Sequence, residues 1–153
     1  MKTFFLLITM GLASLLSASA QNIQPIDEDG LALGGYDVVA YFSNKALKGS
    51  SSYSAKYKGT TYYFSSAKNM NAFKRSPENY LPQYDGYCAW GVAAKDSKFP
   101  INPETFDLVD GKLYLFYNGD FNGKPFNTSL LWKQETVKLR AAADKKWPSV
   151  KSK

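Results

Sequence analysis

The sequence contains no histidine and a single cysteine, Cys88. Without histidine, neither a Ser-His nor a Cys-His catalytic pair can form. Sites for soft metals normally use several thiolate or imidazole ligands, whereas this sequence contains one thiol and no imidazole. A lone cysteine also excludes an internal disulfide, so Cys88 is a buried packing residue, a ligand or reactive group, or half of an intermolecular bridge. These absences favour binding over catalysis.

Long apolar runs are also missing, except near the N-terminus. Residues 4–16 form a short apolar stretch after Lys2, and Ala18-Ser19-Ala20 matches the pattern that signal peptidase cleaves. No later segment approaches the roughly 18 apolar residues of a membrane span. We expect residues 1–20 to be a signal peptide cleaved after Ala20, an uncleaved anchor being the alternative. The mature chain, residues 21–153, is then periplasmic or secreted and not an integral membrane protein.

The positive charge of the chain is dispersed. The formal net charge is +6, and the lysines are scattered except in the tail around residues 145–153. A nucleic-acid interface would need a basic stripe on a recognisable module, so no nucleic-acid partner is expected. The mature length fits one domain that can bury a core without disulfides.

The pattern of apolar residues predicts an α+β fold. Residues 53–64 alternate aromatic and polar side chains around Lys58-Gly59, which indicates a β-hairpin, and residues 105–117 form a second one turning at Asp110-Gly111. Ser65 or Ser66 is expected to cap a helix that ends before Pro77. Residues 86–94 should form a short helix, and an amphipathic helix from about 128 to 146 closes the chain. We therefore expect a small single domain of antiparallel β-hairpins, packed by short helices and a C-terminal amphipathic helix.

Two segments hold the candidate site residues. Cys88 is either a small hydrophobe on a buried helix face or a reactive or ligating thiolate at a helix N-terminus, although Asp85 adds the wrong charge for a thiolate. Asp37 is either a cap or turn acceptor or a ligand-binding carboxylate beside tyrosines. If the fold brings both segments into one pocket, its lining comes from this set: Tyr36, Asp37, Tyr41, Tyr84, Tyr87, Cys88 and Trp90.

Several motifs together resemble a known family. These motifs are GGYDVVAYF (34–42), GTTYYFSSAKNMNAFKRSPENYLPQYDGYCAWG (59–91), VDGKLYLFYN (109–118) and AAADKKWP (141–148). In this order they look like the exported bacterial YHS domain proteins, over nearly the whole mature chain. The central part is similar to the wider YHS and TRASH group, which implies a small metal-associated module.

The chain departs from the metal-binding pattern of that group. Metal-binding members carry cysteines before the hairpin and directly after its Tyr-Phe. This chain has Tyr36 and Asp37 in the first neighbourhood, and Ser65, Ser66 and Asn69 in the second. The resemblance therefore predicts the fold more than the metal chemistry.

The function expected from the sequence is that of a non-enzymatic binding module, an accessory to metal handling or to an envelope protein complex. Its partner is a small ligand, a metal ion or an envelope protein. In one alternative, Cys88, together with Met70, holds a soft transition metal such as copper or zinc, and a second protomer completes the site. In the other, the chain is a thiol-dependent redox protein or enzyme that uses Cys88.

Processing provides the first test. Because the positive N-terminus, apolar run and cleavage pattern occur together, intact-mass measurement of the exported protein should give a chain that begins at Gln21. Exported material that retains residues 1–20 would contradict the signal peptide.

Overall fold

The computed structural model describes residues 21–153, so the expected signal peptide lies outside the described part. The N-terminal half contains the 3-10 helices η1 (Leu33–Gly35) and η2 (Ala40–Ser43), strands β1 (Ser50–Tyr57) and β2 (Thr60–Phe64), helix α1 (Ala67–Arg75), and the 3-10 helices η3 (Pro77–Asn79) and η4 (Gln83–Gly86). The C-terminal half contains α2 (Ala89–Lys95), β3 (Asn102–Val109), β4 (Lys112–Phe116), β5 (Asn118–Phe121), β6 (Lys124–Asn127), α3 (Thr128–Gln134) and α4 (Thr136–Lys151).

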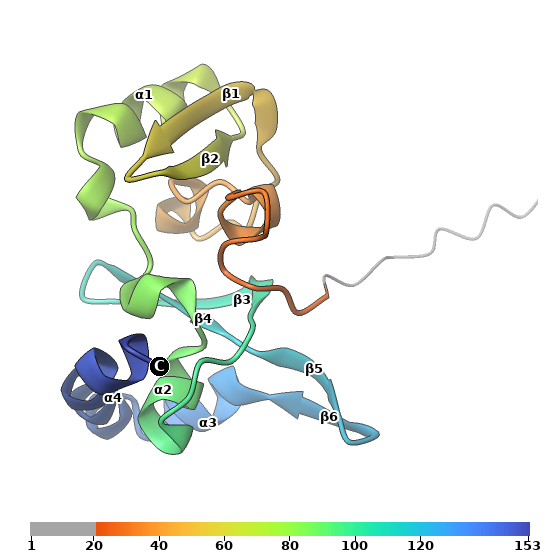
Figure 1. Ribbon diagram of the computed structural model, residues 1–153, viewed down its shortest axis with the longest axis vertical. Helices are drawn as coiled ribbons and strands as arrows, with labels where there is room; N and C mark the ends of the chain where they lie inside the picture. Colours follow the sequence, from red (N-terminus) through yellow and green to blue (C-terminus); the bar gives the residue numbers. More distant parts are fainter. Residues whose placement is uncertain (1–20) are drawn as a thin grey trace, which may run out of the picture.

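The elements form two groups. Figure 1 shows β1, β2 and α1 at one end and α2, α3 and α4 at the other, with β3 and β4 passing between them. Each hairpin is an antiparallel pair: β1 with β2, β3 with β4, and β5 with β6. This arrangement of hairpins and helices confirms the predicted α+β class. In the described residues, no helix is long and apolar enough to cross a membrane.

The first hairpin forms where the aromatic alternation predicted it. Lys58 and Gly59 both have positive φ, 47° and 84°, as a tight hairpin turn requires. Phe64 is fully buried, and its ring centroid lies 5.1 Å from that of Phe73 on α1. Tyr62 is also buried against Phe73. These rings join the hairpin to α1 in one aromatic core.

Helix α1 begins and ends as expected. The side chain of Ser66 accepts a hydrogen bond of 3.2 Å from the backbone N–H of Asn69, which makes Ser66 the N-cap. The helix ends at Arg75, two residues before Pro77, because proline lacks the N–H that would continue it.

The second hairpin has both faces of β4 buried. Its turn, Asp110-Gly111, has positive φ at both residues, as predicted. Leu113 and Leu115 are buried, but so are Tyr114 and Phe116 on the opposite face, where both rings pack against Trp132 of α3. Both faces of β4 are therefore buried, because α3 covers the face that carries Tyr114 and Phe116.

Two helix predictions need correction. The expected helix from 128 to 146 is interrupted at Glu135, whose φ and ψ of −140° and 41° are not helical, and α4 continues to Lys151. The helix expected over 86–94 starts at Ala89, because Gly86 is left-handed (φ 84°) and Tyr87 is extended (φ −67°, ψ 157°). The third hairpin, β5–β6, was not predicted, although its turn Asn122-Gly123 is a common hairpin signal.

A stability measurement tests the aromatic core. Because Phe64 is fully buried beside Phe73, Phe64→Ala should lower the free energy of unfolding by about 3–5 kcal/mol in a denaturant titration. Tyr53→Ala on the same hairpin is the matched control, since Tyr53 is 38% exposed, and it should cost less than about 1 kcal/mol. Equal losses would mean that this hairpin face does not form the core.

Candidate functional site

Asp37 is a buried carboxylate that accepts five hydrogen bonds. Its Oδ1 accepts from the backbone N–H groups of Val39 (2.9 Å) and Ala40 (3.2 Å). Its Oδ2 accepts from the N–H (2.8 Å) and hydroxyl (2.7 Å) of Ser65 and from the Asn69 side-chain amide (2.7 Å). Asp37 is 0% exposed. These bonds stabilise the buried charge and fasten the start of η2 to the segment joining β2 and α1.

The Asp37 cluster does not fit a soft metal. Ser65 and Asn69 lie in the neighbourhoods where the family resemblance implies metal ligands, but both donate hydrogen bonds to Asp37. The Asn69 amide nitrogen that faces Asp37 has no lone pair to offer a metal. Copper and zinc prefer thiolate and imidazole groups, and no such group takes part in this cluster. Asp37 acts here as a cap and cross-link.

Tyr36 and Tyr41 attach this region to β3. The Tyr36 hydroxyl donates to Glu104 (3.0 Å), and the Tyr41 hydroxyl donates to the carbonyl of Pro103 (2.7 Å). Burial raises the pKa of both phenols above the usual value, and the carboxylate of Glu104 adds to this effect. Both tyrosines therefore keep their protons and act as donors in packing.

Cys88 occupies the N-cap of α2 and is fully buried. Its Sγ accepts a hydrogen bond from the N–H of Gly91 (3.5 Å) and lies 3.2 Å from Oγ1 of Thr128. Because the Thr128 hydroxyl donates to the carbonyl of Tyr117, the thiol proton of Cys88 can donate to Thr128. This arrangement satisfies a neutral thiol and supports the packing interpretation. Among residues 21–153, no group of three or more His, Cys, Asp or Glu side chains could hold a metal ion.

The two predicted halves of the site make different contacts. The hydrogen-bond partners of Asp37 lie around η2 and α1, whereas those of Cys88 lie around α2 and α3. Tyr87 and Trp90 pack against Trp147 and Phe126 respectively. Two surface cavities accompany the segment 78–85, and neither is lined by Asp37 or Cys88. These cavities therefore give the predicted shared pocket no support.

The first cavity has a volume of about 400 Å³ and a lining that includes six apolar residues. Tyr57 and Tyr62 of the first hairpin add aromatic surface. The apolar lining comprises Pro25, Ile26, Ala32, Leu33, Leu81 and Pro82, and the charged lining comprises Lys58, Glu78, Asp85 and Lys151. This combination of apolar surface and a few polar groups is typical of small-molecule sites.

The charged groups of this cavity are held in ion pairs. Oε1 of Glu78 accepts from the hydroxyl of Tyr57 (2.5 Å) and the ammonium of Lys58 (2.6 Å), and the bond from Lys58 is the main reason that the pKa of Glu78 is lowered. Lys151 lies 2.9 Å from Oδ2 of Asp85. The side chains of Glu78 and Asp85 stay in contact with solvent, at 61% and 50% exposed.

The second cavity, of about 340 Å³, adjoins the first. The two cavities share Glu78, Leu81, Pro82 and Asp85 in their linings. The second adds Gln83, Tyr84, Asp144, Trp147 and Pro148. It therefore extends the first cavity from the hairpin toward α4.

A left-handed turn contributes residues to both cavities. Tyr84, Asp85 and Gly86 have consecutive φ values of 57°, 51° and 84°. For residues with a side chain this conformation costs roughly 1–2 kcal/mol each. Gly86 is required here, since an added Cβ would lie 3.0 Å from Pro25 Cβ. Strained backbone of this kind clusters at functional sites, so the turn marks these cavities as the candidate site.

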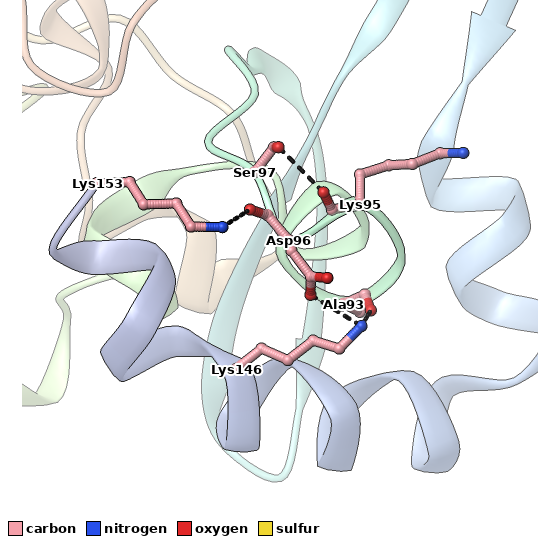
Figure 2. A network of polar contacts seen from close by, with 6 residues as sticks. All are labelled: Ala93, Lys95, Asp96, Ser97, Lys146 and Lys153. Carbon is pink, nitrogen blue, oxygen red and sulfur yellow. Dashed lines mark hydrogen bonds and ion pairs between the residues drawn. The ribbon is translucent and has the colours of Figure 1, made fainter.

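Lysine side chains fix α4 next to the cavities. Figure 2 shows Lys146 donating to the carbonyl of Ala93 (2.7 Å) and pairing with Asp96 (2.9 Å), while Lys153 donates to the carbonyl of Asp96 (3.0 Å). These bonds satisfy carbonyls at the C-terminal end of α2, where helices lack internal partners. They also hold the turn of α4 that presents Trp147 and Lys151 to the cavities.

Sequence reasoning identified only part of this site. It named Tyr84 as a candidate site residue, but not Glu78, Asp144 or Trp147. No local pattern marks these residues, because the cavities collect them from separate segments of the chain. The glycine of the turn, Gly86, was the one local signal.

Substitution of Asp37 tests the buried carboxylate. Asp37→Asn places an amide group among five donors, so at least one donor loses its acceptor. The free energy of unfolding should fall by about 3 kcal/mol in a denaturant titration. The control is Asp120→Asn, which alters an exposed carboxylate bonded to Gly123 and should cost less than about 1 kcal/mol. A similar small loss for both variants would contradict the cross-linking role of Asp37.

Comparison with known proteins identifies one domain. No curated protein and no solved structure matches the chain. The family model of the YHS domain matches residues 38–84. This region contains η2, the first hairpin, α1 and η3, and it ends at Tyr84 in the left-handed turn. The chain therefore contains a YHS domain at these residues.

Proposed function

We propose that this protein is an exported, non-enzymatic binding module that takes a small organic ligand in the first cavity. The observation that supports it is the cavity of about 400 Å³, with an apolar lining, two tyrosines and a charged margin. Small-molecule sites have this size and composition. Export is inferred from the N-terminal sequence alone.

The position of the cavity supports the proposal. Its lining combines YHS domain residues, such as Tyr57 and Leu81, with Ile26 from the preceding segment and Lys151 from α4. Binding sites often form where separate parts of a fold meet, because a hollow there is lined from several directions. The left-handed turn beside it adds a strained element of the kind found at ligand sites.

The side chains favour an organic ligand over a resident soft metal. YHS domains are linked to metal binding in general, but here Asp37 is saturated with donors and Cys88 is a buried thiol with a hydroxyl neighbour. An accessory role in metal handling or in an envelope complex would then act through a bound ligand or partner protein. The buried thiol equally gives no support to a thiol enzyme.

Binding of an uncharged fluorescent probe tests this proposal. N-phenyl-1-naphthylamine should bind the protein with an increase in fluorescence, because the apolar lining can remove its rings from water. Ile26→Ser should weaken binding about threefold to tenfold, since Ile26 supplies part of that lining. Ile26 is 45% exposed, so the substitution should leave folding intact.

The control substitution lies outside both cavities. Leu130→Ser changes an apolar side chain that is 61% exposed on α3, and it should leave probe binding unchanged. Absence of probe binding, or equal weakening by both substitutions, would refute the cavity as the binding site.

A further inference from the structure

We propose that the second cavity is a subsite for an organic ammonium group, so that the ligand is a small amphiphilic ammonium compound. The ammonium group lies in the second cavity and the apolar body in the first. This inference rests on the proposed function, since it names the ligand class of the same site. It is supported by charge, aromatic surface and the position of one lysine.

The lining of the second cavity is acidic. It contains three carboxylates, Glu78, Asp85 and Asp144, and no lysine or arginine. The negative charge of this lining is opposite in sign to the formal net charge of the whole chain, which is +6. Glu78 and Asp85 have lysine partners, but within residues 21–153 Asp144 takes part in no ion pair. Asp144 is therefore the carboxylate that can take a cation without displacing one.

The hydrogen bonding of Asp144 leaves it able to bind a cation. Its Oδ1 accepts one hydrogen bond, of 2.8 Å, from the hydroxyl of Tyr84. Burial and this bond raise the pKa of Tyr84 well above the usual value, so the phenol stays neutral and remains the donor. A carboxylate can accept about four hydrogen bonds, which leaves Asp144 with acceptor capacity toward a ligand.

Aromatic rings form a wall suited to an organic cation. The centroids of Tyr84 and Trp147 lie 5.8 Å apart with an angle of 63° between the rings. Both side chains line the second cavity. Tryptophan and tyrosine faces attract ammonium groups, and this attraction strengthens when water is excluded.

Lys151 shows that an ammonium group fits beside this wall. Its Nζ lies 2.9 Å from Oδ2 of Asp85 and 5.8 Å from the centroid of Trp147. It therefore combines a carboxylate and an aromatic face in the way expected of the ligand. Because Lys151 already forms an ion pair with Asp85, it competes with a ligand cation for that carboxylate.

The apolar part of the ligand has a continuous path. Leu81 and Pro82 line both cavities, so a hydrocarbon chain that starts at the ammonium group can lie along them. It then reaches the apolar lining that includes Ile26 and Leu33. The three carboxylates do not form a cluster that could hold a metal ion, within the part of the chain that the structure describes. A larger organic cation, in contrast, can contact one carboxylate and the rings together.

Calorimetric titration with matched amphiphiles tests the inference. Octyltrimethylammonium, below its micelle concentration, should bind at one site. Octyl sulfate has the same chain with the opposite charge and should bind at least tenfold more weakly. Tetramethylammonium, which lacks the chain, should also bind more weakly, because the apolar lining stays uncovered.

Three variants locate the cation. Asp144→Asn should weaken the binding of octyltrimethylammonium about tenfold, because the unpaired carboxylate charge is lost. Lys151→Gln should strengthen it severalfold, because Asp85 loses its internal partner. Glu135→Gln, at an exposed carboxylate that lines neither cavity, should leave binding unchanged. The opposite effects of the first two variants separate cation binding from loss of folding.

The outcomes distinguish this inference from the proposed function. Equal binding of octyl sulfate, or full binding by Asp144→Asn, overturns the ammonium subsite. If octyltrimethylammonium fails to bind while N-phenyl-1-naphthylamine still binds through Ile26, the ammonium subsite is wrong and the binding module stands. If neither compound binds, both proposals fail.

Discussion

The left-handed turn at Tyr84, Asp85 and Gly86 is the constraint on which the site depends. It ends the YHS region, reverses the chain before α2, and places Tyr84 and Asp85 in the cavity linings. Its conformation is unfavourable for residues with side chains. Tyr84 donates to Asp144 and Asp85 pairs with Lys151, so both residues of the turn contact α4.

The C-terminal helix is thus part of the site as well as of the core. Lys146 and Lys153 bond to groups at the end of α2, and Lys98 donates to the carbonyl of Lys151. The bonds of Lys153 and Lys98 are exposed, whereas the bond from Lys146 to Ala93 is partly buried. Together these lysine bonds join α4 to α2. The face of α4 that carries Trp147 lines the second cavity.

Asp37 has a comparable role within the YHS region. Its five hydrogen bonds join segments that the family resemblance associates with metal ligands, and here the cross-link is a carboxylate with backbone, hydroxyl and amide donors. A buried charge persists when such donors replace its hydration. The fold therefore keeps this junction closed by its own side chains, and the proposed ligand site lies in the cavities beside η4.

Sequence alone determined the predicted hairpin turns and the cap of α1. Lys58-Gly59 and Asp110-Gly111 specify hairpin turns and Ser66 caps α1, because these signals act between residues close in the chain. Asn122-Gly123 carried the same signal for the third hairpin. Only the tertiary structure decided the break at Glu135 and the burial of both faces of β4. The cavities, too, arise only from the tertiary structure. Their lining combines residues from Pro25 to Lys151, and such contacts over long sequence distances leave no periodic pattern to read.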